Sequence, residues 1–187
     1  MQRRYRMNLN RDNSALALRP AVDADCGPLA SFVNAGYRGD SSKAGWTTEA
    51  DLLDGQRVDA DGLRDAIGKP GSVVLLHESA GEINGCVALE RRSGDCHLGM
   101  LTVSPIRQST GLGRRLLAAA ELYALDQLGA TRMLMSVIVQ RPELIAWYER
   151  RGYERTGRFE PFPYGDERFG LPRRPDLRFE ILEKSLR

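Results

Sequence analysis

The chain has 187 residues, of which 42% are hydrophobic and 28% are charged, and its formal net charge at pH 7 is +2. This length and composition fit one globular domain with an ordinary apolar core. The balanced charge argues against a nucleic-acid partner. No apolar run approaches the ~20 residues of a membrane-spanning helix, so we expect no membrane partner.

The N-terminal segment is rich in arginine, but no apolar stretch follows it, so it is not a secretory signal. We expect a flexible arm over 1–14 and a single domain over 15–187. The three cysteines have no metal-ligand spacing and do not form an even set. They are typical of a reduced cytoplasmic protein. The two histidines stand outside any ligand cluster, so we also expect no metal site.

The predicted elements follow the order strand, helices, three strands, helix, strand, helix and two strands. β-rich runs predict strands over 16–19, 72–76, 83–89, 97–103, 133–139, 153–159 and 177–186. Apolar spacing and capping residues predict helices from about 26 onward, over 46–53, over 59–67, from Gly113 onward and over 141–151, with a polar loop over 36–45. This order indicates a single α+β domain with helices on both faces of a sheet.

The most informative stretch joins the strand over 97–103 to the next helix through a loop that contains Gly111 and Gly113. A helix N-terminus presents free backbone N–H groups and the positive end of the helix dipole, which together attract anions. The glycines allow close approach of a ligand, and Arg114 and Arg115 supply cationic donors for phosphate oxygens. The stretch therefore predicts a pyrophosphate-binding loop.

Two common nucleotide motifs do not fit this loop. A P-loop requires Lys-Ser/Thr after its last glycine, whereas Arg114 and Arg115 follow Gly113 here. The dinucleotide fingerprint requires a third glycine, and Leu116 occupies that position. Both nucleotide interpretations therefore fail on residue type.

Two blocks of the sequence resemble the GNAT superfamily of acetyl-CoA-dependent N-acetyltransferases. The first is the Leu-x-Val-x-Pro strand over 101–105, followed by Gln-x-x-Gly-x-Gly over 108–113. The second, over 144–153, is similar to the family's helix that ends in Tyr-Glu-x-x-Gly-Phe/Tyr. The resemblance implies a mixed, mostly antiparallel, curved sheet with helices on both faces, whose fourth and fifth strands splay apart around acetyl-CoA.

The resemblance also implies a set of acetyl-CoA-binding residues in the first block. These are Leu101, Thr102, Val103, Gln108, Ser109, Thr110, Gly111, Leu112, Gly113 and Arg114. The backbone of the strand would hold the pantetheine arm and polarise the acetyl carbonyl, while the side chains of Leu101 and Val103 would belong to the core. Arg141 stands where many relatives have asparagine, and it could reach a phosphate instead.

Three side chains are candidates for proton transfer. By resemblance, Tyr148 would lie beside the coenzyme A sulfur and donate a proton to the departing thiolate. The alternative is that Tyr148 only packs, because it shares a helix face with other apolar residues. For the general base, His97 and Glu90 are candidates, and a water chain with no dedicated base is the third option.

The sequence gives less specific evidence about the residues that would bind the acceptor amine. Six acidic residues between Glu49 and Asp65 could form a wall that attracts a cationic amine, or they could lie on solvated helix faces. The leading hypothesis is acetyl transfer from acetyl-CoA to a primary amine of a small molecule or peptide. The alternative is a non-catalytic acyl-CoA-binding module that serves as a sensor or interaction partner. A homodimer is the default expectation for assembly.

Overall fold

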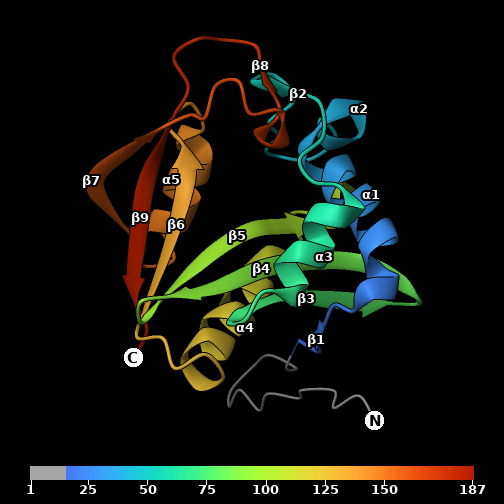
Figure 1. The fold of residues 1–187 in the computed structure, drawn as a ribbon, viewed down its shortest axis with the longest axis vertical. Helices are drawn as coiled ribbons and strands as arrows, with labels where there is room; N and C mark the ends of the chain where they lie inside the picture. The colour runs from blue at the N-terminus through green and yellow to red at the C-terminus, as the bar shows by residue number, and fades with distance from the viewer. Residues whose placement is uncertain (1–15) are drawn as a thin grey trace.

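The computed structural model describes residues 16–187, so the arm predicted over 1–14 lies outside the described residues. The large sheet has the strand order β1-β3-β4-β5-β6-β9-β7, and β2 pairs separately with β8. Every neighbouring pair in the large sheet is antiparallel except β5 and β6, which are parallel. This mixed, mostly antiparallel sheet confirms the predicted fold class (Figure 1).

The strands are β1 (Arg19–Pro20), β2 (Leu53–Asp54), β3 (Ser72–Ser79), β4 (Glu82–Arg92), β5 (Asp95–Val103), β6 (Arg132–Ile138), β7 (Glu154–Pro161), β8 (Leu171–Pro172) and β9 (Arg178–Ser185). The α-helices are α1 (Cys26–Tyr37), α2 (Gly39–Ser42), α3 (Ala60–Gly68), α4 (Leu112–Asp126) and α5 (Pro142–Glu149). Single 3₁₀ turns form η1 (Asp23–Asp25), η2 (Pro105–Arg107) and η3 (Glu167–Phe169). No helix of the described chain combines the length and apolarity needed to cross a bilayer.

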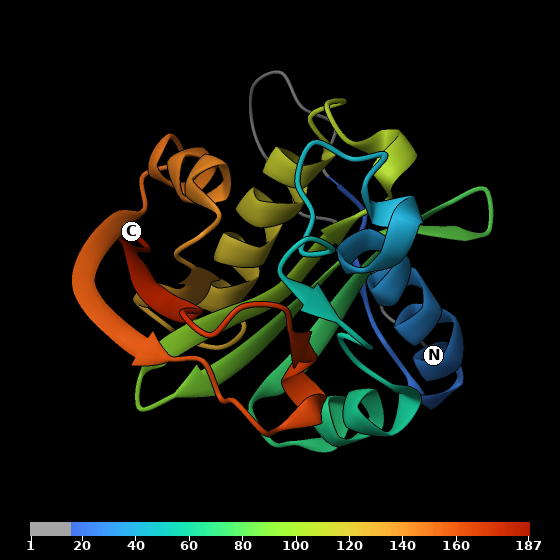
Figure 2. The ribbon, with the colours of Figure 1, turned by 90° about the horizontal axis from the view of Figure 1, so that it is seen from above.

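Two apolar cores lie on opposite faces of the large sheet. Helices α4 and α5 cover one face, where Leu116 packs in the same cluster as Leu75. Helices α1 and α3 cover the other face, where Leu63 packs with Val74 and Leu76 (Figures 1 and 2). Successive residues of β3 thus alternate between the two cores, as the two-residue period of a strand requires.

Two local predictions before α3 are wrong. Residues 46–53 do not form a helix but a series of turns that ends in β2, which pairs with β8. The tertiary structure overrides the helical pattern here because the Glu49 carboxylate is drawn into ion pairs with two buried arginines. The loop predicted over 36–45 instead contains the end of α1 and the short helix α2.

The sheet opens between β5 and β6. These strands pair only at Cys96–Met133 and His97–Leu134, after which they separate. In Figure 1, strands β6, β9 and β7 turn away from β3, β4 and β5 beyond this point. The expected splay between the fourth and fifth strands of the sheet is therefore present, and the edge of β5 beyond His97 is not covered by β6.

A β-bulge lies on the open stretch of β5. Cys86 pairs with Thr102 and Ala88 pairs with Gly99, so Met100 and Leu101 together oppose the single residue Val87. Met100 has φ +54°, a left-handed conformation that is uncommon outside glycine. A bulge leaves an extra residue outside the ladder and turns the strand locally. The bulge therefore turns the backbone at Met100 and Leu101, within the stretch of β5 that β6 does not cover.

Candidate active site

The loop after β5 delivers an uncapped helix N-terminus to the open edge of the sheet. Gly111 precedes α4 with φ +85°, and no side chain caps the helix. The first intrahelical bond at this end runs from the Arg115 N–H to the Gly111 carbonyl at 3.1 Å. The N–H groups of Leu112, Gly113 and Arg114 precede it and have no acceptor within the helix. These free N–H groups have the geometry that the predicted anion-binding loop requires.

A cavity of about 340 Å³ lies against this loop. Its floor is formed by Leu101, Thr102 and Val103 of β5, and its sides include Gln108, Ser109, Gly111, Gly113 and Arg114. Thr110 and Leu112 belong to the same loop but do not line the cavity, since Leu112 is buried in the core and the Thr110 hydroxyl donates to the Arg107 carbonyl. The described structure thus brings most of the predicted acetyl-CoA residues together.

Two tryptophans and one arginine extend the wall of this smaller cavity. Trp46 and Trp147 stack with ring centroids 6.4 Å apart, and the guanidinium of Arg151 lies 3.5 Å from the Trp147 ring centroid. Burial, and then the charges of Arg150 and Arg114, lower the pKa of Arg151. The site therefore holds two mutually repelling cations, Arg114 and Arg151, which an anionic ligand would stabilise.

The side chain of Gln108 joins two distant segments at the cavity. Its Oε1 accepts from the Trp46 backbone N–H at 2.9 Å, and its Nε2 donates to the Val103 carbonyl at 3.4 Å. The predicted loop residue thus has a positioning contact that sequence spacing did not reveal. It fixes the turn that carries Trp46 against the end of β5.

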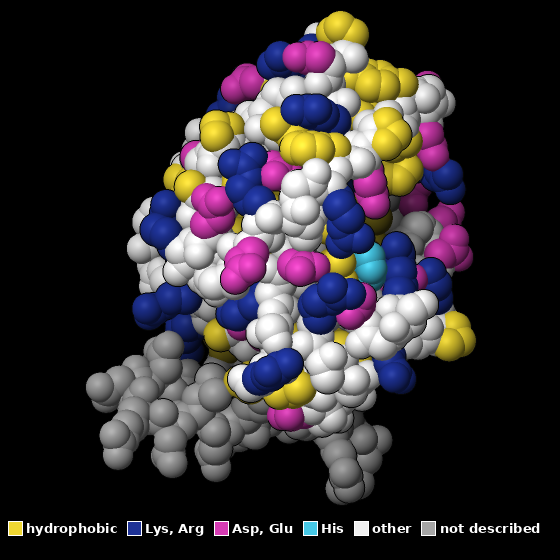
Figure 3. Space-filling view, turned by 90° about the vertical axis from the view of Figure 1, so that its left-hand side faces the viewer, with side chains coloured by type: hydrophobic (Ala, Val, Ile, Leu, Met, Phe, Trp, Pro, Cys, Tyr) yellow, Lys and Arg dark blue, Asp and Glu magenta, His cyan; other side chains and the backbone are white. Residues whose placement is uncertain are grey.

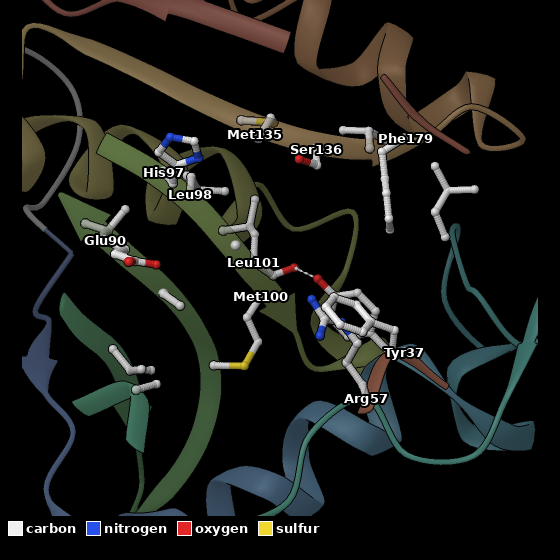
Figure 4. A pocket seen from close by; sticks show the side chains of 18 of the residues that line it. Tyr37, Arg57, Glu90, His97, Leu98, Met100, Leu101, Met135, Ser136 and Phe179 are labelled. Carbon is white, nitrogen blue, oxygen red and sulfur yellow. Dashed lines mark hydrogen bonds between the residues drawn. The ribbon is translucent and has the colours of Figure 1, made fainter. Parts of the chain in front are cut away.

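A second cavity, of about 590 Å³, lies on the other side of the β5 edge. Tyr37, Leu101, Arg141, Leu144 and Tyr148 line both cavities, so the two spaces meet at these residues. Figure 4 shows a set of labelled residues that includes Tyr37 and Arg57 at one end and His97 and Glu90 at the other. A donor in the smaller cavity and an acceptor in the larger one could therefore meet beside Leu101.

Tyr148 projects from α5 at this junction. Its ring packs edge-on against Trp147 and Tyr153, at centroid distances of 5.0 and 5.5 Å. No residue of the described chain hydrogen-bonds to its hydroxyl. Burial raises the pKa of Tyr148, so the group stays protonated at neutral pH and can act as a donor.

Tyr37 faces the same junction from α1. Its hydroxyl donates to the Leu101 carbonyl at 3.4 Å, as the dashed line in Figure 4 shows. The sequence suggested only a place on the lip of a pocket for this residue. Its contact with the bulged strand could not be read from the sequence, because the two residues are 64 positions apart.

Both predicted base candidates line the larger cavity, away from the junction. His97 is four residues before Leu101, which at ~3.3 Å per residue places it roughly 13 Å along the strand. Burial lowers the pKa of His97, so its imidazole is neutral at pH 7. Hydrogen bonds from Arg92 and Lys69 lower the pKa of Glu90 to about 2, which makes this carboxylate a weak base.

Arg141 lies in a buried ion-pair network rather than free toward a phosphate. Its Nη1 donates to Glu49 Oε1 at 2.9 Å and its Nη2 donates to Thr47 Oγ1 at 2.7 Å. Arg38 Nη2 lies 3.1 Å from the other oxygen of Glu49. The sequence did not predict this network, which joins α1, the turn before β2 and the start of α5.

The acidic stretch from Glu49 to Asp65 does not form one wall. Glu49 is buried, and Asp59 caps α3 by accepting from the Gly62 N–H at 2.7 Å. Only Glu49 and Asp65 of the six line the larger cavity. On the face seen in Figure 3, the left-hand side of Figure 1, cationic and acidic side chains are interspersed. Within residues 16–187, no group of His, Cys, Asp and Glu is arranged to bind a metal ion.

A curved mixed sheet that opens between two parallel strands, with a glycine loop and an uncapped helix at the opening, defines a GNAT fold. The sequence model of the family described as "Acetyltransferase (GNAT) domain" matches residues 45–160. The chain belongs to this acetyltransferase family.

A curated relative, mycothiol acetyltransferase from Salinispora tropica, is 32% identical over 145 residues. The alignment covers 74% of this chain and 44% of the relative, so the chain spans less than half of that protein.

Solved structures show the same fold at lower identity. The yncA putative acetyltransferase from Salmonella typhimurium, solved with acetyl-CoA, has a TM-score of 0.64 and 22% identity, covering 91% of this chain and 93% of that one. The ribosomal-protein-S18-alanine N-acetyltransferase from Escherichia coli has a TM-score of 0.65 and 14% identity, covering 90% and 92%. At these identities the likeness establishes the fold alone.

Proposed function

We infer that the protein transfers an acetyl group from acetyl-CoA to a primary amine in a ternary complex. The observation that carries this proposal is the meeting of two cavities at Leu101 and Tyr148, one lined by an anion-binding helix end and the other open to an acceptor. In such a transfer a C–N bond forms, the C–S bond breaks, the amine loses a proton and the departing thiolate gains one.

The smaller cavity fits a diphosphate-bearing thioester. The free N–H groups at the start of α4, together with Arg114 and Arg151, would hold the phosphates. The Nε of Arg151 is buried and has no hydrogen-bond acceptor, which leaves a donor for such a ligand. The open edge of β5 would bond the pantetheine arm, and a strand N–H would polarise the thioester carbonyl.

Tyr148 would supply the proton that the departing thiolate takes up. Its position at the junction and its unpartnered hydroxyl support this role. The amine proton would leave through water in the larger cavity toward His97, whose neutral imidazole can accept it. Glu90, with both its oxygens engaged by cations, would position the Lys69–Arg92 cluster instead.

The three free, buried cysteines, Cys26, Cys86 and Cys96, support a location in the reducing cytoplasm. A homodimer stays a prediction.

Isothermal titration and a thiol-release assay test the proposed function. We expect binding of acetyl-CoA and coenzyme A but not ATP, and release of free thiol when a suitable amine is added. Arg151→Gln should weaken binding about tenfold through loss of a charged donor, whereas Arg150→Gln, on the exposed neighbour, should not. Tight binding with no thiol release across a broad amine panel would instead identify a non-catalytic acyl-CoA-binding module.

A further inference from the structure

We propose that the acceptor is an α-amino acid, whose carboxylate binds Arg57 at the Tyr37 end of the larger cavity while its amino group reaches the junction at Leu101. This inference rests on the proposed function and specifies its substrate class.

Arg57 is a cation without a counter-ion among residues 16–187. Its guanidinium carbon lies 5.5 Å from the centroid of the Tyr37 ring, and the side chain is half-buried against the larger cavity. No carboxylate of the described chain forms an ion pair with it. The stacking on Tyr37 orients the planar guanidinium, and a planar, oriented fork is suited to binding a carboxylate through two hydrogen bonds.

The neighbouring buried network adds to the positive charge at this end of the cavity. Arg38 and Arg141 share the single carboxylate of Glu49, and all three side chains are buried, with 6–7% exposure. The Nε atoms of both arginines are buried without an acceptor. Burial, with the nearby charge of Arg57 as a further cause, lowers the pKa of Arg38. The buried carboxylate of Glu49 is shared by Arg38 and Arg141; Asp54 also acts on Arg38 but is paired with Arg173, and Asp65 lines the same cavity. Of the three arginines, Arg57 alone forms no ion pair within residues 16–187, so a ligand carboxylate would be stabilised beside it.

The end of the larger cavity that holds Glu90 and His97 does not have an excess of positive charge. Lys69 and Arg92 both pair with Glu90. Glu160, which forms no ion pair within the described part of the chain, acts electrostatically on Arg92 and His97. Figure 4 shows Glu90 and His97 well separated from Arg57 and Tyr37. A ligand carboxylate is therefore favoured at the Arg57 end rather than along the whole cavity.

Tyr37 contacts both the Arg57 guanidinium and the strand residue Leu101, beside which the reaction would occur. Its ring contacts Arg57 and its hydroxyl reaches the Leu101 carbonyl, so one side chain spans the distance between the two. An amine and a carboxylate that both bind beside this ring must be close together in the same molecule. An α-amino acid meets this requirement, whereas a polyamine would bring a second cation toward Arg57.

Kinetics on matched acceptors test the proposal. We would measure kcat/KM, calculated on the concentration of free amine, for a panel of L-amino acids and the corresponding amino acid amides, which lack the carboxylate charge. The wild type should prefer the acids by about tenfold to a hundredfold, the range expected for a charge-assisted contact. Arg57→Gln should bring this ratio close to one by lowering kcat/KM for the acids more than for the amides. Arg64→Gln makes the same change on an exposed face of α3 outside the cavity and should keep the ratio.

A binding measurement separates this inference from the proposed function. With coenzyme A present, N-acetyl amino acids should bind more tightly than their amides by the same factor, and Arg57→Gln should remove the difference. Equal binding of acid and amide, or binding of neither, would overturn the inference. So would a wild-type preference for amides. Failure of thiol release with every amine would refute the proposed function, while this binding difference would still report on the carboxylate site.

Discussion

Arg141 Nη1 donates to Glu49 Oε1 at 2.9 Å, and this buried contact joins residues that are 92 positions apart in the chain. The pair lies beside the junction of the two cavities, because both residues line the larger cavity and Arg141 also lines the smaller one. It positions the start of α5 against the turns that precede β2. Tyr148 lies near the other end of the same helix. The network therefore has a structural role in holding the two halves of the site together.

Removing the Glu49 charge should destabilise the fold strongly. Glu49→Gln leaves Arg38 and Arg141 buried without a counter-ion, and breaking a buried pair in this way costs about 3–5 kcal/mol. Urea unfolding should show this loss in the free energy of unfolding. As a control, Asp166→Asn breaks the exposed ion pair between Asp166 and Arg168 and should leave the free energy of unfolding unchanged. Equal effects of the two variants would show that the network does not stabilise the fold.

Tyr148→Phe should lower kcat about a hundredfold through loss of the proton donor, with the Kd for acetyl-CoA nearly unchanged. Tyr153→Phe is the matched control. Tyr153 packs against Tyr148 but its hydroxyl donates to Glu121 at 3.0 Å, and it lines neither cavity. That variant should lose stability while keeping its turnover. Wild-type kcat in Tyr148→Phe would mean that the tyrosine serves only in packing.

Gly111→Ala should weaken acetyl-CoA binding about tenfold. At φ +85° an alanine costs ~1–2 kcal/mol, and relaxation of this strain would tilt the first N–H groups of α4. Gly94→Ala introduces the same strain at φ +92° in the turn between β4 and β5, also with open space around the new Cβ. Both variants should lose similar stability, but only the first should change the calorimetric Kd. An unchanged Kd in Gly111→Ala would argue against the proposed phosphate-binding loop.

The half-buried His97 should make the stability of the fold depend on pH. Burial lowers the pKa of His97 below 6.5, so between its folded pKa and ~6.5 the unfolded state binds the additional proton. The free energy of unfolding should therefore rise with pH through this window and level off above it. His97→Gln should show a smaller rise between pH 5 and 7 in urea unfolding than the wild type. The same rise in His97→Gln as in the wild type would contradict this assignment.

If His97 receives the amine proton, kcat/KM should depend on pH over the range in which His97 loses its own proton. The acid limb of kcat/KM should have an apparent pKa below 6.5 in the wild type, and His97→Gln should lose this limb. Retention of the limb in that variant would favour proton release to water alone.

Local sequence determined the central unit of this protein. The strand ending at Val103, the glycines at 111 and 113 and the helix that follows are contiguous, so their chemistry could be interpreted from neighbouring residues alone. The same holds for the Tyr148 helix, and both blocks fit the observed α4 and α5. The free N–H groups at the start of α4 follow from backbone geometry, which any sequence with these turn residues would share.

Only the tertiary structure decided what surrounds that unit. Arg141 binds the carboxylate of Glu49 instead of being free to bind a phosphate. The helix predicted over 46–53 does not form, because Glu49 is held in ion pairs with two buried arginines. The position of Tyr37 at the junction, and that of Arg57 against the Tyr37 ring, likewise result from contacts between segments that are distant in the chain. Ion pairing and burial act through space, so residues distant in sequence determine them, whereas turn and cap geometry is set by neighbouring residues.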